Sequence, residues 1–109
     1  MATIFKVLGQ SNPSAATPTD IYTVPSSTSA IISTINICNQ SANGSQFNIS
    51  VRPAGASLIS KHYIAYNAGI AANDSVSLTI GVTLATTDVV TVSANNASVS
   101  FNVFGSEIT

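Results

Sequence analysis

FNISV at residues 47–51 and VSFNV at residues 99–103 alternate strictly between apolar and polar side chains. Successive side chains on a β-strand point to opposite faces of its sheet, so each run gives a strand with one apolar face and one face of amides and hydroxyls. Similar runs recur along the 109 residues, separated by turn-forming residues, and no stretch shows a helical period. The pattern predicts an all-β, single-domain β-sandwich or jelly roll of about seven to nine mostly antiparallel strands.

Working outward from these two runs, we expect strands at residues 3–9, 21–24, 29–39, 46–52, 58–66, 75–80, 82–84, 88–94 and 98–104. Asn43-Gly44 is typical of tight hairpin turns, so we expect strand 46–52 to be the partner of strand 29–39. Residues 67–73 are expected to form a loop and residues 105–109 a short tail.

The apolar positions of two expected strands predict which side chains point inward. Ile31, Ile35 and Ile37 are expected to face one way along strand 29–39. The alternation in strand 75–80 places its apolar side chains inward, ending with Ile80.

The N-terminal part of the chain is expected to form an arm. Residues 3–9 are apolar and β-prone, and the following stretch holds Pro13 and Pro18 among small polar residues, which favours extended backbone. We therefore divide the single domain into a strand and linker arm at 1–20 and a sandwich body at 21–109. Such an arm either pairs within its own domain or reaches a neighbour, and its apolar side chains are candidate interface residues: Ile4, Phe5, Val7 and Leu8.

The low charge of the chain excludes several classes of partner. Charged residues make up 6% of the chain, against about 25% in an average globular protein. Three cations, Lys6, Arg52 and Lys61, cannot form the basic surface that nucleic acid or an anionic membrane requires. No apolar run approaches the roughly 20 residues that span a bilayer, and the first residues show no signal-peptide pattern, so we expect synthesis in a host cytoplasm. Strand edges with so little charge are weakly protected, which favours an oligomer that covers them.

Catalytic and metal-binding patterns are missing from the sequence. It contains one histidine, His62, one cysteine, Cys38, and no Gly-x-Ser-x-Gly motif. We interpret His62 as a surface or interface residue on a strand and Cys38 as a small packed hydrophobe. Asp20, Asp74 and Asp88 lie in expected loops, where we interpret them as turn-supporting residues rather than calcium ligands. We therefore expect no catalytic residue, no metal site and no cofactor.

Arg52, Tyr63 and Tyr66 form one notable polar and aromatic group. Arg52 ends one expected strand and both tyrosines lie on the next. If those strands pair, the guanidinium would stack on a ring for about 0.5–2 kcal/mol. A contact site for a partner is the equal alternative, because Arg and Tyr are enriched at interfaces. With His62, these residues complete the set of candidate interface residues.

Several phrases of the sequence, taken together, carry a resemblance to a known group of proteins. They are KVLGQS (6–11), DIYTVP (20–25), ICN (37–39), VRPAG (51–55), KHYI (61–64), AAND (71–74) and FGSEIT (104–109). The chain resembles small virion structural proteins of tailed bacteriophages, especially those of cyanobacterial and marine hosts, nearly from end to end. The resemblance implies an all-β component of the particle, such as a capsid decoration (cement) protein or a small tail, neck or fibre-adaptor protein.

The expected function is therefore that of a non-enzymatic virion protein, with capsid decoration as the first hypothesis. This hypothesis implies other virion proteins as partners, the major capsid protein first among them, and a homo-oligomer, with a trimer favoured by the resemblance. A tail, neck or fibre-adaptor component is the second hypothesis. A carbohydrate-binding β-sandwich for host adsorption is the third, although the chain has no Trp and only 6% aromatic residues to form a sugar-binding platform.

Overall fold

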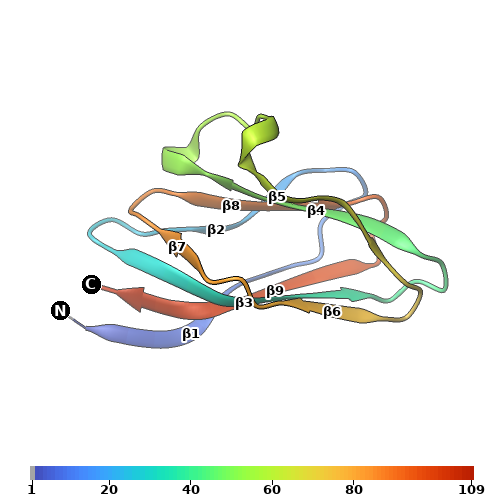
Figure 1. Cartoon of the computed structure of the whole chain (residues 1–109), viewed down its shortest axis with the longest axis horizontal. Coiled ribbons are helices and arrows are strands. Elements are labelled where there is room, and N and C mark those ends of the chain that lie inside the picture. The colour runs from blue at the N-terminus through green and yellow to red at the C-terminus, as the bar shows by residue number, and fades with distance from the viewer. Residues whose placement is uncertain (1) are drawn as a thin grey trace.

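A computed structural model describes residues 2–109, which form nine strands in two stacked antiparallel sheets. The first sheet has the order β1 (Thr3–Ser11), β9 (Val99–Ile108), β3 (Ser29–Asn39) and β6 (Ser75–Leu78), with β7 (Val82–Leu84) paired to the other half of β3. The second sheet has the order β2 (Thr19–Thr23), β8 (Val89–Ala94), β4 (Ser45–Arg52) and β5 (Tyr63–Ile70). Figure 1 shows the two layers, and the predicted all-β sandwich is confirmed.

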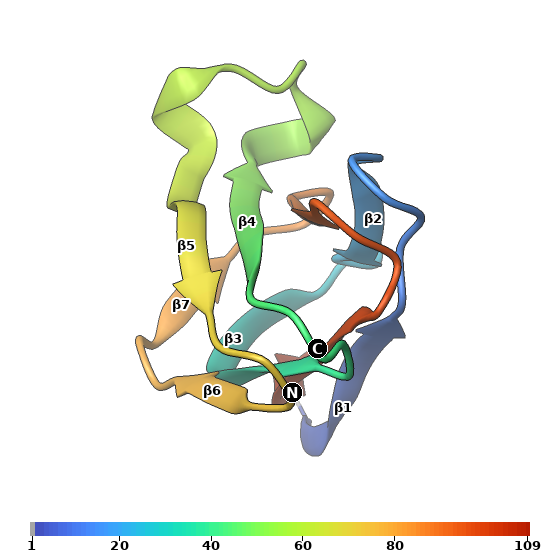
Figure 2. The same cartoon turned by 90° about the vertical axis from the view of Figure 1, so that its right-hand side faces the viewer.

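Two short 3-10 turns connect β4 to β5. They are η1 (Pro53–Gly55) and η2 (Ser60–His62), and Figure 2 shows them beyond the ends of the two strands. Strand β5 begins at Tyr63, later than expected, and continues to Ile70 through the stretch that the sequence predicts as a loop. Asn67 has a positive φ of 49° where the pairing of β4 with β5 is irregular, so a bulge replaces the predicted loop.

The core lies between the two sheets and is built by the alternating runs. Phe47 and Ile49 of β4 meet Phe101 and Val103 of β9, and all four are at most 2% exposed. The rings of Phe47 and Phe101 make an edge-to-face contact, with centroids 6.3 Å apart. The pattern that decides the fold class thus supplies the residues at the centre of the core.

The expected hairpin between residues 29–39 and 46–52 is wrong. Strands β3 and β4 lie in different sheets, and Asn43-Gly44 is part of a connection that crosses from one sheet to the other. Asn39, only 1% exposed, fixes this crossing because its amide nitrogen donates to the carbonyls of Asn43 and Ala71. Both strands carry strongly apolar inner faces, and placing them in opposite layers lets these faces bury each other.

The prediction that three isoleucines of β3 face one way is also wrong. Ile35 and Ile37 are fully buried, whereas Ile31 is 40% exposed. A bulge between Ile32 and Thr34, opposite β9, adds one residue and shifts the alternation, so that Ile32 points inward and Ile31 outward. Ile80, expected inward, is 49% exposed because β6 ends at Leu78.

The N-terminal strand pairs within its own domain. Strand β1 is antiparallel to β9, and the backbones of Ala2 and Thr109 exchange two hydrogen bonds, so the two ends of the chain lie side by side (Figure 1). The proline-containing linker crosses from the first sheet to the second and is tied to the body by Asn12, whose amide donates to the carbonyls of Ala97 and Val99. Residues 105–108, expected in a tail, extend β9 along β1 and β3.

Candidate interface

An apolar patch lies on the outer face of the first sheet, where a sandwich normally presents polar side chains to water. It consists of Phe5 and Val7 of β1, Ile31 of β3 and Phe104 of β9, whose exposures are 84%, 47%, 40% and 37%. The strand register brings them together: Val7 lies opposite Phe104, while Phe5 and Ile31 flank Ser106 of β9. A surface hollow of about 500 Å³ has all four members of the apolar patch in its lining.

The two bulges beside β9 produce the apolar patch. One lies between Val7 and Gly9 on β1, and the other between Ile32 and Thr34 on β3. Each changes which side chains face outward on its strand. Gly105 of β9 is required beside the second bulge, because a Cβ atom there would overlap the carbonyl oxygen of Ile31. The apolar patch is therefore a product of a specific backbone geometry.

Strand β1 is also an edge of the first sheet. It pairs with β9 on one side, and no strand of residues 2–109 pairs with its other side. Its single charged residue, Lys6, is held in an ion pair with Glu107 at 3.1 Å. Unpaired strand edges recruit further strands unless charge, Pro or a bulge prevents it. Here the bulge after Val7 leaves a regular segment at residues 3–7, directly beside the apolar patch.

Glu107 joins the two sheets at the end where the chain termini lie. Its Oε2 accepts a 2.6 Å hydrogen bond from the hydroxyl of Tyr22 on β2, and its Oε1 accepts one from Lys6. The hydrogen bond from Tyr22 lowers the pKa of Glu107 below its ordinary value, against the opposing effect of burial and with a further contribution from Lys6. Burial, followed by the hydrogen bond and charge of Glu107, raises the pKa of Tyr22. The arrangement therefore stabilises the ionised carboxylate of Glu107 and the neutral hydroxyl of Tyr22, which are the two forms that make this hydrogen bond.

Arg52 does not stack on a tyrosine ring, which is one of the two alternatives that the sequence leaves open. Its guanidinium donates to Asp20 at 2.8 Å, to Thr91 at 3.0 Å and to the carbonyls of Gly55 and Ala56. These four acceptors, one of which is the opposite charge of Asp20, hold Arg52 against the second sheet, with its side chain 16% exposed. The structure therefore places Arg52 in a local network that fixes the start of the β4–β5 connection.

Two other candidate interface residues are buried. His62 is 6% exposed in η2, and its Nδ1 accepts a hydrogen bond from the backbone N–H of Ile59, so it supports a turn and does not lie on a surface strand. Leu8 is 8% exposed and belongs to the core, because the bulge at this point turns it inward. Ile4, in contrast, is 53% exposed; it lies opposite Glu107 of β9, so it points to the other face of the sheet from Phe5 and Val7.

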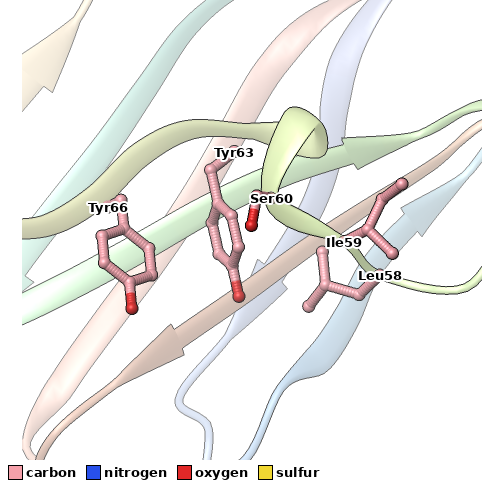
Figure 3. A pocket seen from close by; sticks show the side chains of 5 residues that line it. All are labelled: Leu58, Ile59, Ser60, Tyr63 and Tyr66. Carbon is pink, nitrogen blue, oxygen red and sulfur yellow. The ribbon is translucent and has the colours of Figure 1, made fainter.

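Tyr63 and Tyr66 lie side by side on β5. Their rings make an edge-to-face contact with centroids 4.8 Å apart, and Figure 3 shows both hydroxyls pointing the same way. Tyr66 is 66% exposed and Tyr63 is half-buried. The pair lines two hollows of the surface, one toward Leu58 and Ile59 and the other over the outer face of the second sheet.

Asp74 and Asp88 support turns, as the sequence predicts, whereas Asp20 lies in strand β2 and not in the expected loop. Asp88 accepts from the backbone N–H groups of Ala54 and Ala85, and Asp74 accepts from the N–H of Ser75. Asp20 accepts from Thr91 and Arg52. Among residues 2–109, no three His, Cys, Asp or Glu side chains are grouped to hold a metal ion. Within the same residues there is no helix long and apolar enough to cross a membrane.

Comparisons with known proteins give no relative: no family profile, curated protein or solved structure matches the chain. Sequence reasoning found Phe5 and Val7 but missed Ile31, Phe104 and the Tyr22–Glu107 cross-link. The sequence does carry a signal for Phe104, because this residue breaks the alternation of β9 just before Gly105. It carries none for the neighbours of Phe104 on the sheet, because these depend on the strand register.

Proposed function

We propose that this protein is a structural component of a bacteriophage particle that docks on other protein subunits, most simply as a capsid decoration protein. The observation that carries the proposal is the apolar patch beside a free strand edge. Exposed apolar residues that occur singly need no explanation, but a contiguous group on one face marks an interaction site. The sequence resemblance supplies the kind of particle, and the apolar patch supplies the means of attachment.

The chemistry of this surface suits permanent assembly. Fully burying a Phe, Val or Ile side chain stabilises a complex by about 1.5–3 kcal/mol, and Phe5 is already 84% exposed and available for burial. Apolar contacts are screened little by salt, whereas surface ion pairs weaken as the ionic strength rises. A chain with three cations and four anions that attaches through Phe and Ile side chains would hold its partner over a wide range of salt.

Strand β1 offers a second mode of contact. Its free edge can accept a strand from a neighbour, so that main-chain hydrogen bonds add affinity and the apolar patch adds specificity. The neighbour is the major capsid protein in our proposal, or a second copy of this chain in the trimer that the resemblance favours. Binding only to the assembled shell would stabilise that shell by mass action. The proposal assigns no catalytic step, cofactor or metal.

A binding experiment on particles tests the proposal. Purified particles that lack this protein are mixed with wild-type chain or with the Phe5→Ser/Phe104→Ser variant, and bound chain is counted after sedimentation. We expect saturable binding of the wild type and loss of at least about tenfold in affinity for the variant, since two apolar side chains no longer become buried. Tyr66→Ser, which removes an exposed ring from the opposite sheet, is the matched control and should bind normally.

Removing the arm is not a suitable test, because Leu8 lies in the core and β1 completes the first sheet. Equal occupancy by the wild type and the Phe5→Ser/Phe104→Ser variant would contradict docking through the apolar patch.

The number of copies per particle distinguishes a component of the head from a component of the tail. A decoration protein should be present in numbers comparable with the major capsid protein, while a tail, neck or fibre-adaptor component should be present in far fewer.

A further inference from the structure

The outer face of the second sheet carries a groove whose two walls come from distant parts of the chain. One wall is the β1–β2 linker at Ala16 and Pro18, and the other is β5 at Tyr63 and Tyr66. Amide and hydroxyl side chains of β4 and β8 form the floor between the walls, and the groove has a volume of about 300 Å³. It lies on the sheet opposite to the apolar patch, so docking through that patch leaves the groove open to solvent.

Hydrogen bonds fix the linker wall and the floor of the groove. The backbone N–H of Ala16 donates to the carbonyl of Ala94 on β8 at 2.7 Å, which fixes the linker wall to the sheet. On the floor, the side chain of Asn48 donates to Ser93 at 3.1 Å and accepts from the backbone N–H of Asn67 at 2.8 Å. A preformed groove saves a ligand the entropy cost of ordering the site.

Several polar groups around the groove have no hydrogen-bond partner among the residues that the structure describes. Within residues 2–109, the Tyr63 and Tyr66 hydroxyls and the side-chain amides of Gln46 and Asn67 make no hydrogen bond. The side chain of Asn95 accepts from Ser45 and from the N–H of Gln46, and its NH₂ group donates to no atom of this part of the chain. These groups are uncharged and include donors and acceptors on both sides of the floor.

No charged side chain of the described residues lines the groove or the adjoining hollow beside Leu58 and Ile59. An anionic ligand, whether nucleic acid, phosphate or sulfated polymer, would find no cation there. A mainly apolar peptide would cover the amides of the floor without giving them hydrogen-bond partners. The combination that fits is a neutral polyol: its hydroxyls pair with amides and phenols, and its C–H faces pack on the tyrosine rings.

From this geometry we propose that the groove between the β1–β2 linker and the Tyr63–Tyr66 pair binds a neutral saccharide. The edge-to-face pair offers the accessible ring of Tyr66 as a platform for a sugar face. Gln46, Asn67 and Asn95 supply the hydrogen bonds that set the orientation of the sugar. The site would give a particle-bound protein a weak hold on surface glycans, which many copies on one particle would convert into avidity.

The first experiment screens an array of neutral and acidic bacterial and plant oligosaccharides with the fluorescently labelled full chain. The best neutral hit is then titrated into the ¹⁵N-labelled chain and followed by NMR. We expect shifts of the backbone signals of Gln46, Asn67 and Asn95, and little change on β1 or β9. Absence of any neutral hit on the array, or shifts confined to the apolar patch, would overturn the proposal.

Variants separate the site from the rest of the chain. Tyr66→Ala should weaken binding of the array hit by at least about tenfold, because the sugar loses its aromatic platform. Tyr66→Phe keeps the ring and should lose much less. Ile64→Ala on the same strand, which lines neither hollow, and Phe5→Ser on the opposite sheet are the controls and should bind like the wild type.

Three outcomes would count against the proposal. The first is normal binding of the array hit by Tyr66→Ala, and the second is a consistent preference for anionic sugars. The third is binding of an unstructured peptide that depends on the tyrosines, together with no binding of any sugar. Because this test uses soluble glycans, its result is independent of whether the apolar patch attaches the chain to a particle.

Discussion

The hydroxyl of Tyr22 on β2 donates a 2.6 Å hydrogen bond to the carboxylate of Glu107 on β9, and this bond connects the two sheets of the sandwich. Tyr22 is 8% exposed and the side chain of Glu107 is 11% exposed, so both groups have given up most of their water. Lys6 neutralises the carboxylate from β1. One part-buried polar group, the Glu107 carboxylate, therefore ties β1, β2 and β9 together at the end of the molecule where Ala2 and Thr109 lie.

Removing the Tyr22 hydroxyl should destabilise the protein. Tyr22→Phe leaves Glu107 with Lys6 as its remaining side-chain partner, and hydrogen bonds to charged groups contribute about 1.5–3 kcal/mol. We expect the free energy of unfolding in urea to fall by this amount. Tyr63→Phe, which removes a hydroxyl that has no partner in residues 2–109, is the control and should unfold like the wild type. Equal stability of the two variants would contradict the assigned role of the cross-link.

The same contact predicts how stability changes with acid. The pKa of Glu107 is lower in the folded chain than its unfolded value of about 4.3, mainly because Tyr22 donates to it. The resulting stabilisation is complete above the unfolded pKa and is lost as the pH falls through the folded pKa. Urea midpoints measured from pH 7 to pH 2 should therefore fall more steeply for the wild type than for Glu107→Gln. Parallel curves would show that Glu107 titrates alike in both states.

Gly105 should tolerate no side chain. A Cβ atom at Gly105 would overlap the Ile31 carbonyl, which belongs to backbone and cannot move aside without disturbing the β3–β9 pairing. We expect Gly105→Ala to lower the free energy of unfolding by about 1–3 kcal/mol. Gly69→Ala is the matched control, because a Cβ atom there meets open space, and it should leave stability unchanged or slightly raised. A neutral Gly105→Ala variant would mean that the bulge beside Ile31 relaxes easily.

The apolar patch should contribute to association and little to folding. Phe5 is 84% exposed, so Phe5→Ser should change the free energy of unfolding by no more than about 0.5 kcal/mol. Phe101→Ala, which empties a fully buried position, should cost about 3–5 kcal/mol. Chemical denaturation measures both.

Sedimentation velocity tests whether copies of the chain also associate through the apolar patch. At micromolar concentration we expect the wild type to sediment as an oligomer and the Phe5→Ser/Phe104→Ser variant to shift toward monomer. A wild-type chain that stays monomeric would remove the homo-oligomer from the proposal and leave docking on another protein.

Local pattern accounts for the success of the sequence predictions on β4 and β9. Phe47, Ile49, Phe101 and Val103 are buried as the alternation requires, because the direction of a side chain on a regular strand depends only on its position in that strand. The aspartate turns were predictable for the same reason, since Asp74 and Asp88 bond to backbone close by in the sequence.

The predictions failed where a distant strand decided the outcome. Ile31 does not share a face with Ile35 and Ile37, and Leu8 lies in the core and not at an interface, because a bulge is defined by the partner strand as much as by its own residues. The sequence left Arg52 open between a stack on a tyrosine ring and a contact with a partner, and in the structure it donates to Asp20, 32 positions earlier in the chain.

The sequence by itself determined that this chain is an all-β sandwich with a nearly uncharged surface, because alternation and composition are properties of neighbouring residues. Tertiary structure alone decided that Phe5, Val7, Ile31 and Phe104 meet on one face, that Tyr22 reaches Glu107, and that Tyr66 faces a groove lined by side-chain amides. Each of these three features joins residues from segments far apart in the sequence. Their meeting is set by register and by bulges, which form only when the strands pair.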